Sequence, residues 1–320
     1  MPSPPTGRPL PPTLDPRARA LLESLPQKPA LRTLRPEDIR AWPTVVPGAP
    51  EPVATVVHRG IPGPAGWLRV RIYHPAGAGP HPAMLWMHGG GWVIGNLEWV
   101  DSICRALTAR AACVVVSVDY RLAPEAKFPG PFEDAYAALD WLVGAAADLR
   151  VDAQRIAVGG ESAGGNLAAA ITLAARDRRG PSVLFQVLIN PVTDAGEDHS
   201  PSMAEFADGP IVTHQDMKWF ADQYLRGPED VADPYVSMLR APDLHGLPPA
   251  LVVTAGCDPL RDQGEAYAAR LREAGVDAVT WRYDGMPHGF LGWQASLDDA
   301  RRALAEICSD VKRRFATAGP

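Results

Sequence analysis

The stretch 155–170 limits the possible fold more than any other part of the chain, because it joins a strand, a serine motif and a helix. Ile156–Val158 is a short apolar run that indicates the end of a buried strand, and the alanine- and leucine-rich sequence from Asn166 onward favours a helix. Between them lies Gly-Glu-Ser-Ala-Gly at 160–164. A sharp strand-to-helix turn of this kind holds a serine out of the backbone as a nucleophile, and the helix behind it aims free N–H groups at the reaction centre.

This motif by itself is weak evidence, since glycine and serine are common in loops. A glycine-rich packing turn explains the five residues about equally well, and only the surrounding chain can decide between the two readings.

The rest of the chain supplies that context as an alternation of strands and helices. We expect strands at 83–87, 113–118, 183–189, 250–254 and 278–283, and helices from about 98, at 131–147, about 263–274 and about 297–315. Two further strands, at 53–57 and 67–73, flank a turn at 60–64 and should form an antiparallel pair at a sheet edge. The pattern predicts an α/β fold: a mostly parallel, doubly wound, twisted sheet flanked by helices.

Two segments have no place in this alternation. Residues 1–50 are rich in proline and hold two short amphipathic helices, the first beginning at Asp15-Pro16 and the second at 36–42. The second segment, about 195–240, is polar and turn-rich, with one helix at 213–225. We therefore divide the chain into an N-terminal segment, 1–50, that we expect to be loosely attached up to about residue 13, and a core, 51–320, that carries an insertion at about 195–240.

Residues that follow the apolar runs lie at the carboxyl ends of the strands, where such sheets place their ligands. Ser162, Asp258 and His288 occur there in the chain order nucleophile, acid, base, which is the order of an α/β-hydrolase triad. Asp262 competes with Asp258 for the role of the acid, but it lies in the next helix, where it suits the positive helix end. A lone histidine is more often a surface or core residue; His288 stands out by its tight turn just after a strand.

The triple glycine at 89–91 is the second informative loop. Acyl transfer needs two or three N–H donors aimed at the carbonyl oxygen as it becomes an anion, and backbone amides converge so closely only without side chains. We expect Gly89, Gly90 and the amide of Ala163 to form this oxyanion hole, with His88 as a hydrogen-bonding residue that shapes the loop. A flexible linker is the alternative, which the tryptophans on either side disfavour.

Composition excludes several other classes of protein. The net charge is −6, so no basic surface suggests nucleic acid, and no apolar run reaches the length of a membrane span. The N-terminus lacks the pattern of a secretory signal, so we expect a cytoplasmic protein. The four cysteines lack metal-ligand spacing and should pack as small apolar residues. We expect no cofactor and no metal.

Taken together, five motifs in this order resemble the bacterial hormone-sensitive-lipase-like (family IV) esterases, from about residue 15 to the C-terminus. They are His-Gly-Gly-Gly-Trp at 88–92, Asp-Tyr-Arg-Leu-Ala-Pro-Glu at 119–125, Gly-Glu-Ser-Ala-Gly-Gly-Asn-Leu-Ala at 160–168, Asp-Pro-Leu-Arg-Asp at 258–262 and His-Gly-Phe at 288–290. The resemblance implies the same triad and oxyanion hole, and a cap built from N-terminal helices plus an insertion. Glu161 departs from it, since many members have aspartate there.

The expected activity is hydrolysis of short- to medium-chain acyl esters through an acyl-enzyme, with a small-molecule ester as the partner. Two alternatives stay open: an amide hydrolase or deacetylase with the same triad, and a binding receptor without turnover, although such receptors have lost the histidine. The sequence leaves the natural substrate and the oligomeric state open, a homodimer included. We also expect the helix with Leu21, Leu22 and Leu25 and the helix at 213–225, with Met217, Trp219, Phe220 and Tyr224, to wall a short acyl pocket.

Overall fold

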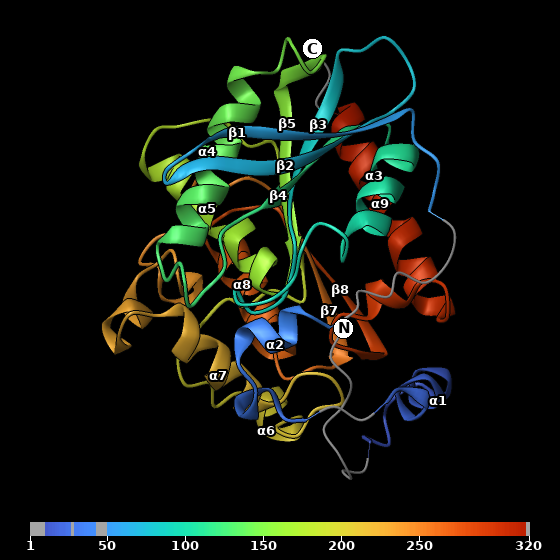
Figure 1. Cartoon of the computed structure of the whole chain (residues 1–320), viewed down its shortest axis with the longest axis vertical. Coiled ribbons are helices and arrows are strands. Elements are labelled where there is room, and N and C mark those ends of the chain that lie inside the picture. Colours follow the sequence, from blue (N-terminus) through green and yellow to red (C-terminus); the bar gives the residue numbers. More distant parts are fainter. Residues whose placement is uncertain (1–9, 27–28, 43–49, 318–320) are drawn as a thin grey trace.

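A computed structural model describes residues 10–26, 29–42 and 50–317 and shows one eight-stranded sheet. The strands follow the spatial order β1-β2-β4-β3-β5-β6-β7-β8 (Figure 1). Their bounds are β1 Thr55–Gly63, β2 Gly66–His74, β3 His81–Met87, β4 Val114–Asp119, β5 Val151–Glu161, β6 Gln186–Ile189, β7 Ala250–Cys257 and β8 Ala278–Pro287. All pairs from β4 to β8 are parallel. The predicted fold class is therefore confirmed.

The strands β1 and β2 form the antiparallel pair expected at a sheet edge, but the turn between them lies later than expected. Strand β1 continues through Pro62 to Gly63, which pairs with Gly66, so the prediction of a turn at 60–64 is wrong. Proline cannot donate to a ladder, and an edge strand leaves one row of N–H groups unpaired in any case. Pro62 is tolerated inside β1 for this reason.

Helices cover both faces of the sheet (Figure 1). The helices are α1 Pro16–Ser24, α2 Pro36–Arg40, α3 Asp101–Ala111, α4 Gly130–Gly144, α5 Ala163–Asp177, α6 Pro201–Glu205, α7 His214–Tyr224, α8 Arg261–Glu273 and α9 Asp298–Thr317, with short 3-10 turns η1 Leu31–Thr33, η2 Pro228–Ala232, η3 Met238–Arg240 and η4 Phe290–Trp293. One apolar core joins α4, α5 and α8 to one face, and a second joins α3 and α9 to the other. The central strands are buried on both faces, which explains their unbroken apolar sequence.

The insertion contains more helix than its polar sequence predicted. Besides α7, it folds α6 and the turn η2. Helix α7 begins at a capping box, in which the Thr213 hydroxyl accepts from the Asp216 N–H and the Asp216 carboxylate accepts from the Thr213 N–H. This cap fixes where α7 starts and therefore which of its side chains face the core.

The N-terminal helices lie in two different places. Helix α1 begins at the predicted cap Asp15, whose N–H donates to the Gly285 carbonyl at 2.9 Å, so α1 is tied to β8. Leu22 packs with the core on the α3 and α9 face. Turn η1 packs instead against α7, and Leu31 and Ile39 belong to the opposite core. The Pro-rich residues 1–9 lie outside the described residues, and the division at residue 50 stays a prediction.

Candidate active site

Ser162 lies at the junction of β5 and α5 in a strained backbone conformation, with φ +57° and ψ −119°. Its N–H donates to the Ile189 carbonyl of β6 at 2.8 Å, which fixes the turn. A Cβ at Gly160 would lie 2.3 Å from the Gly164 oxygen, and one at Gly164 would lie 2.2 Å from the Met87 oxygen. Neither contact is sterically possible, so both glycines of the motif are required by the close backbone approach.

Three strand ends bring Ser162, His288 and Asp258 together. The His288 Nε2 lies 3.0 Å from the Ser162 Oγ, and its Nδ1 lies 2.7 Å from the Asp258 Oδ2. The second Asp258 oxygen accepts from the Leu260 N–H at 2.9 Å, which orients the carboxylate. All three side chains are buried. This chain of contacts can carry a proton from a hydroxyl to an imidazole that is held in one orientation.

Asp262 lies elsewhere. It is in the first turn of α8, where it accepts from the Ser202 N–H at 2.7 Å and pairs with Arg261 at 2.8 Å. Asp262 therefore joins α8 to α6, and of the two candidate acids only Asp258 contacts His288.

Electrostatics around His288 favour the charged imidazolium. Burial lowers the pKa of His288, but the Asp258 carboxylate, through charge and hydrogen bond, and the charge of Glu161 together raise it above its usual value. Burial raises the pKa of Glu161 itself. The Glu161 Oε1 is buried and has no hydrogen-bond partner among the described residues. Glu161 thus places a second carboxyl group beside Ser162, and one of its oxygens has no hydrogen-bond partner among the described residues.

The glycine loop follows β3 and packs against the serine turn. Gly90 has φ +115°, and a Cβ there would lie 2.2 Å from the Ile94 oxygen, so only glycine fits. His88 is fully buried, stacks on Tyr120 at 4.2 Å between ring centroids, and contacts the Gly89 oxygen through Nδ1 at 2.7 Å. The Tyr120 hydroxyl donates to the His88 oxygen at 2.8 Å. His88 and Tyr120 therefore shape the loop, as expected for His88.

The amide of Ala163 is the first of α5, among the N–H groups that have no acceptor within the helix. Gly89, Gly90 and Ser162 line one small cavity of about 50 Å³ together with His288. The glycine loop and the serine hydroxyl thus border the same cavity, where both can act on one carbonyl group.

The apolar wall of this small cavity comes mainly from the insertion and the loop after β6. Its apolar lining residues are Ile94, Trp99, Val192, Ile211, Val212, Met217 and Phe220. Gly91 allows this approach, since a Cβ there would lie 2.2 Å from the Phe220 ring. Met217 and Phe220 were expected in this role, whereas Val192, Ile211 and Val212 come from irregular segments without a periodic signal and were missed.

Helix α1 contributes no residue to the small cavity, so the prediction that Leu21, Leu22 and Leu25 wall it is wrong. The physical reason is the cap hydrogen bond to Gly285 and the burial of Leu22 at the α3 and α9 face, which hold α1 near β8. On α7, Trp219 and Tyr224 also line no part of it; Tyr224 is buried and stacks on Trp92 at 4.3 Å between ring centroids.

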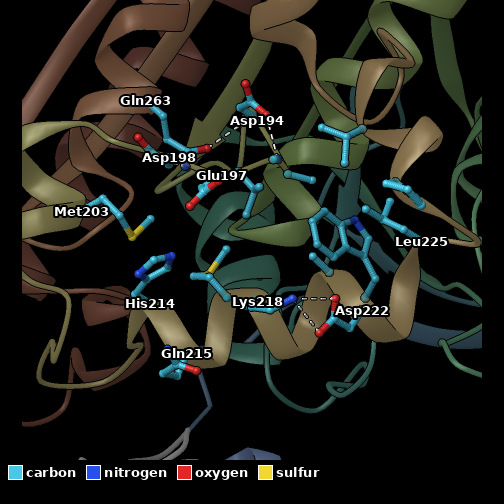
Figure 2. Close-up of a pocket in the computed structure, with 18 of the residues that line it drawn as sticks. Asp194, Glu197, Asp198, Met203, His214, Gln215, Lys218, Asp222, Leu225 and Gln263 are labelled. Atoms are coloured by element: carbon cyan, nitrogen blue, oxygen red, sulfur yellow. Dashed lines mark hydrogen bonds and ion pairs between the residues drawn. The ribbon is translucent and has the colours of Figure 1, made fainter.

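Val192 and Met217 line both this small cavity and a second, larger cavity of about 580 Å³. Figure 2 shows the larger cavity. Its other walls come from the loop 194–198, helix α7 and the segment 225–231. Such a volume is typical of small-molecule sites.

Residues 10–26, 29–42 and 50–317 contain no group of three or more His, Cys, Asp or Glu side chains that could hold a metal ion. No helix within these ranges is long and apolar enough to cross a membrane. All four cysteines are free and buried, as expected for small packing residues.

Three of the known proteins that this chain resembles are esterases, and the matching family model is that of the alpha/beta hydrolase fold. A family model described as the alpha/beta hydrolase fold matches residues 84–292. The carboxylic ester hydrolase LipN of Mycobacterium tuberculosis is 46% identical over 260 residues, which cover 79% of this chain and 68% of that protein. An arylesterase of Saccharolobus solfataricus is 42% identical over 76% of this chain and 79% of its own length. The solved esterase of Pyrobaculum calidifontis superposes with a TM-score of 0.86 at 40% identity, covering 94% of this chain and 98% of the other.

Proposed function

This chain belongs to the alpha/beta hydrolase family and is a serine esterase, and we propose that Ser162, His288 and Asp258 are its catalytic triad. The observation that carries the proposal is the continuous contact from the Ser162 Oγ through the His288 ring to the Asp258 carboxylate. The three residues come from distant parts of the chain and meet at the ends of three parallel strands.

In the proposed mechanism Ser162 Oγ attacks the ester carbonyl carbon while His288 Nε2 accepts the hydroxyl proton. The N–H groups of Gly89, Gly90 and Ala163 stabilise the negative oxygen of the tetrahedral intermediate. His288 then donates the proton to the leaving alcohol, which departs as the C–O bond breaks. Water, activated by His288, hydrolyses the acyl-enzyme and restores Ser162, while Asp258 orients and electrostatically supports the imidazolium throughout.

Covalent labelling tests the nucleophile directly. A small organophosphate should react with the full chain once, and peptide mass spectrometry should find the adduct on Ser162, since the activated hydroxyl is the strongest oxygen nucleophile in the protein. An adduct on another serine would contradict the assignment.

The next prediction concerns how the hydrolysis rate depends on acyl-chain length. We expect kcat/KM for 4-nitrophenyl esters to rise from acetate to chains of medium length and then fall, because each methylene placed against apolar wall adds about 0.8 kcal/mol of binding. A matched 4-nitroanilide series should react far more slowly, which separates an esterase from the alternative amide hydrolase. A profile that keeps rising through long-chain esters would contradict the limit, and comparable anilide rates would favour the amidase.

The pH profile should reveal the influence of Glu161 on the base. His288 must be neutral to accept the serine proton, so kcat/KM should fall as the pH drops through the pKa of His288, which lies above its usual value of about 6.5. Glu161→Gln removes a nearby negative charge, which destabilises the imidazolium, and the acidic limb should therefore move to lower pH.

Glu161→Asp keeps the charge and serves as the matched control. The acidic limb of its pH profile should lie at nearly the same pH as that of the unmodified enzyme. The measurement is kcat/KM for 4-nitrophenyl acetate from pH 5 to 9. A limb that stays in place in Glu161→Gln would show that this carboxyl group does not act on His288.

A further inference from the structure

The larger cavity has a defined relation to the nucleophile. It shares Val192 and Met217 with the small cavity, and its own walls combine apolar side chains, among them Trp92 and Leu225, with a polar rim formed by the loop 194–198. Figure 2 labels Asp194, Glu197 and Asp198 of this loop. At about 580 Å³ it is far larger than an acetyl group requires. The structure therefore offers room for one substantial arm of the substrate.

The proposed triad indicates which arm this is. The leaving alcohol must stay within reach of the His288 Nε2, which protonates it. His288 and Gly289 line only the small cavity, next to Ile211 and Val212, and neither lines the larger one. The alcohol therefore occupies the side of His288, and the acyl arm extends past Val192 and Met217 into the larger cavity.

The cations that line the larger cavity are all engaged by protein groups. The Lys127 Nζ donates to the backbone oxygens of Asp222 and Leu225 at 3.0 and 2.6 Å. Lys218 pairs with the Asp222 carboxylate at 3.1 Å, as Figure 2 shows. Arg226 makes a two-pronged contact with Asp230, with a shortest distance of 2.5 Å. None of the three positive charges is left without an anionic or carbonyl partner.

The carboxylates on the rim differ from one another. Asp194 is neutralised by Arg240 at 2.9 Å. The donors to Asp198 within the described ranges are neutral: the Ser200 N–H at 2.8 Å and the Gln263 amide at 3.1 Å. Glu197 is exposed and has no hydrogen bond or ion pair with any described residue. In Figure 2, Glu197 and Asp198 lie on one wall of the cavity and His214 of α7 lies on the facing wall.

We propose that the larger cavity binds acyl groups of medium length whose far end carries an ammonium group, and that Glu197 is the residue that selects them. The apolar wall of Val192, Met217 and Leu225 accepts the methylene chain. The uncompensated carboxylate of Glu197, supported by Asp198, attracts the cation at the rim. The inference rests on the proposed triad, since that assignment places the acyl arm here.

A pair of isosteric esters tests the charge preference. The 4-nitrophenyl esters of 6-(trimethylammonio)hexanoate and 7,7-dimethyloctanoate differ only by a cationic nitrogen in place of a carbon. In Glu197→Gln we expect the ratio of their kcat/KM values to fall about fivefold against the cationic ester, the upper size for an exposed ion pair. Glu273→Gln, which removes an exposed carboxylate outside the cavity lining, should leave the ratio unchanged.

The cavity itself is tested by filling it. Ala221→Trp places a large side chain in the lining of the larger cavity, so it should lower kcat/KM for both long esters by a larger factor than kcat/KM for 4-nitrophenyl acetate, which needs only the small cavity. An unchanged ratio in Glu197→Gln would overturn the role of Glu197. Two outcomes would overturn the acyl assignment. One is unchanged hydrolysis of both long esters in Ala221→Trp. The other is a preference for cationic esters that appears only when the ammonium group is on the alcohol half of the ester. If the unmodified enzyme does not hydrolyse 4-nitrophenyl acetate at all, that result would instead overturn the proposed triad chemistry.

Discussion

Replacing Ser162 by alanine is expected to lower kcat for 4-nitrophenyl acetate by a factor on the order of 10⁵ to 10⁶. The loss follows from the mechanism, because His288 then has no hydroxyl to deprotonate and no acyl-enzyme can form. Oxyanion stabilisation by the glycine loop and the Ala163 amide would remain, so a residual rate on the order of 10³ over water is compatible with the mechanism.

The measurement requires proof that the variant is folded. Among the described residues the Ser162 Oγ has one hydrogen-bond partner, His288, so its removal should leave the thermal unfolding midpoint close to that of the unmodified enzyme. The variant should also fail to react with the organophosphate. A folded Ser162→Ala protein that hydrolyses esters at a near-normal rate would exclude Ser162 as the nucleophile.

Local chemistry explains why much of this fold was predictable. The apolar runs of β3 and β7 are buried on both faces, so burial alone dictated their composition. The turn at Ser162 was recognisable in the sequence because its flanking positions have no room for a Cβ and must therefore be glycine. Parallel strands end at one edge of a sheet, so residues that follow separate apolar runs, Asp258 and His288 among them, were expected to meet. That the structure brings them together follows from topology; their catalytic roles stay a proposal.

Features that depend on contacts between distant parts of the chain could not be predicted from the sequence. The position of α1 is decided by one cap hydrogen bond to Gly285 and by the burial of Leu22, and its own amphipathic pattern is equally compatible with a place over the cavity. Val192, Ile211 and Val212 line the small cavity from segments with no period. Glu197 had no sequence signal either, because what distinguishes it is its place on the cavity rim without a hydrogen bond or ion pair to any residue that the structure describes.

A pair of substitutions on neighbouring aspartates should separate the acid of the triad from a structural carboxylate. Asp258→Asn is expected to lower kcat by a factor on the order of 10⁴. An amide presents donors as well as an acceptor, so it can hold the His288 ring in the wrong tautomer and gives the imidazolium no compensating charge. The substitution changes the contact between the Asp258 Oδ2 and the His288 Nδ1, which are 2.7 Å apart.

Asp262→Asn is the matched control, since it makes the same chemical change four residues along the chain. It weakens the ion pair with Arg261 and the acceptance of the Ser202 N–H, which join α8 to α6. Asp262 contacts no triad residue, so we expect kcat to change only a few fold and the free energy of unfolding to fall by about 1 kcal/mol. Measurement of kcat and denaturant unfolding for both variants distinguishes the two roles, because a large kinetic loss in Asp262→Asn with a small one in Asp258→Asn would transfer the acid's role to Asp262.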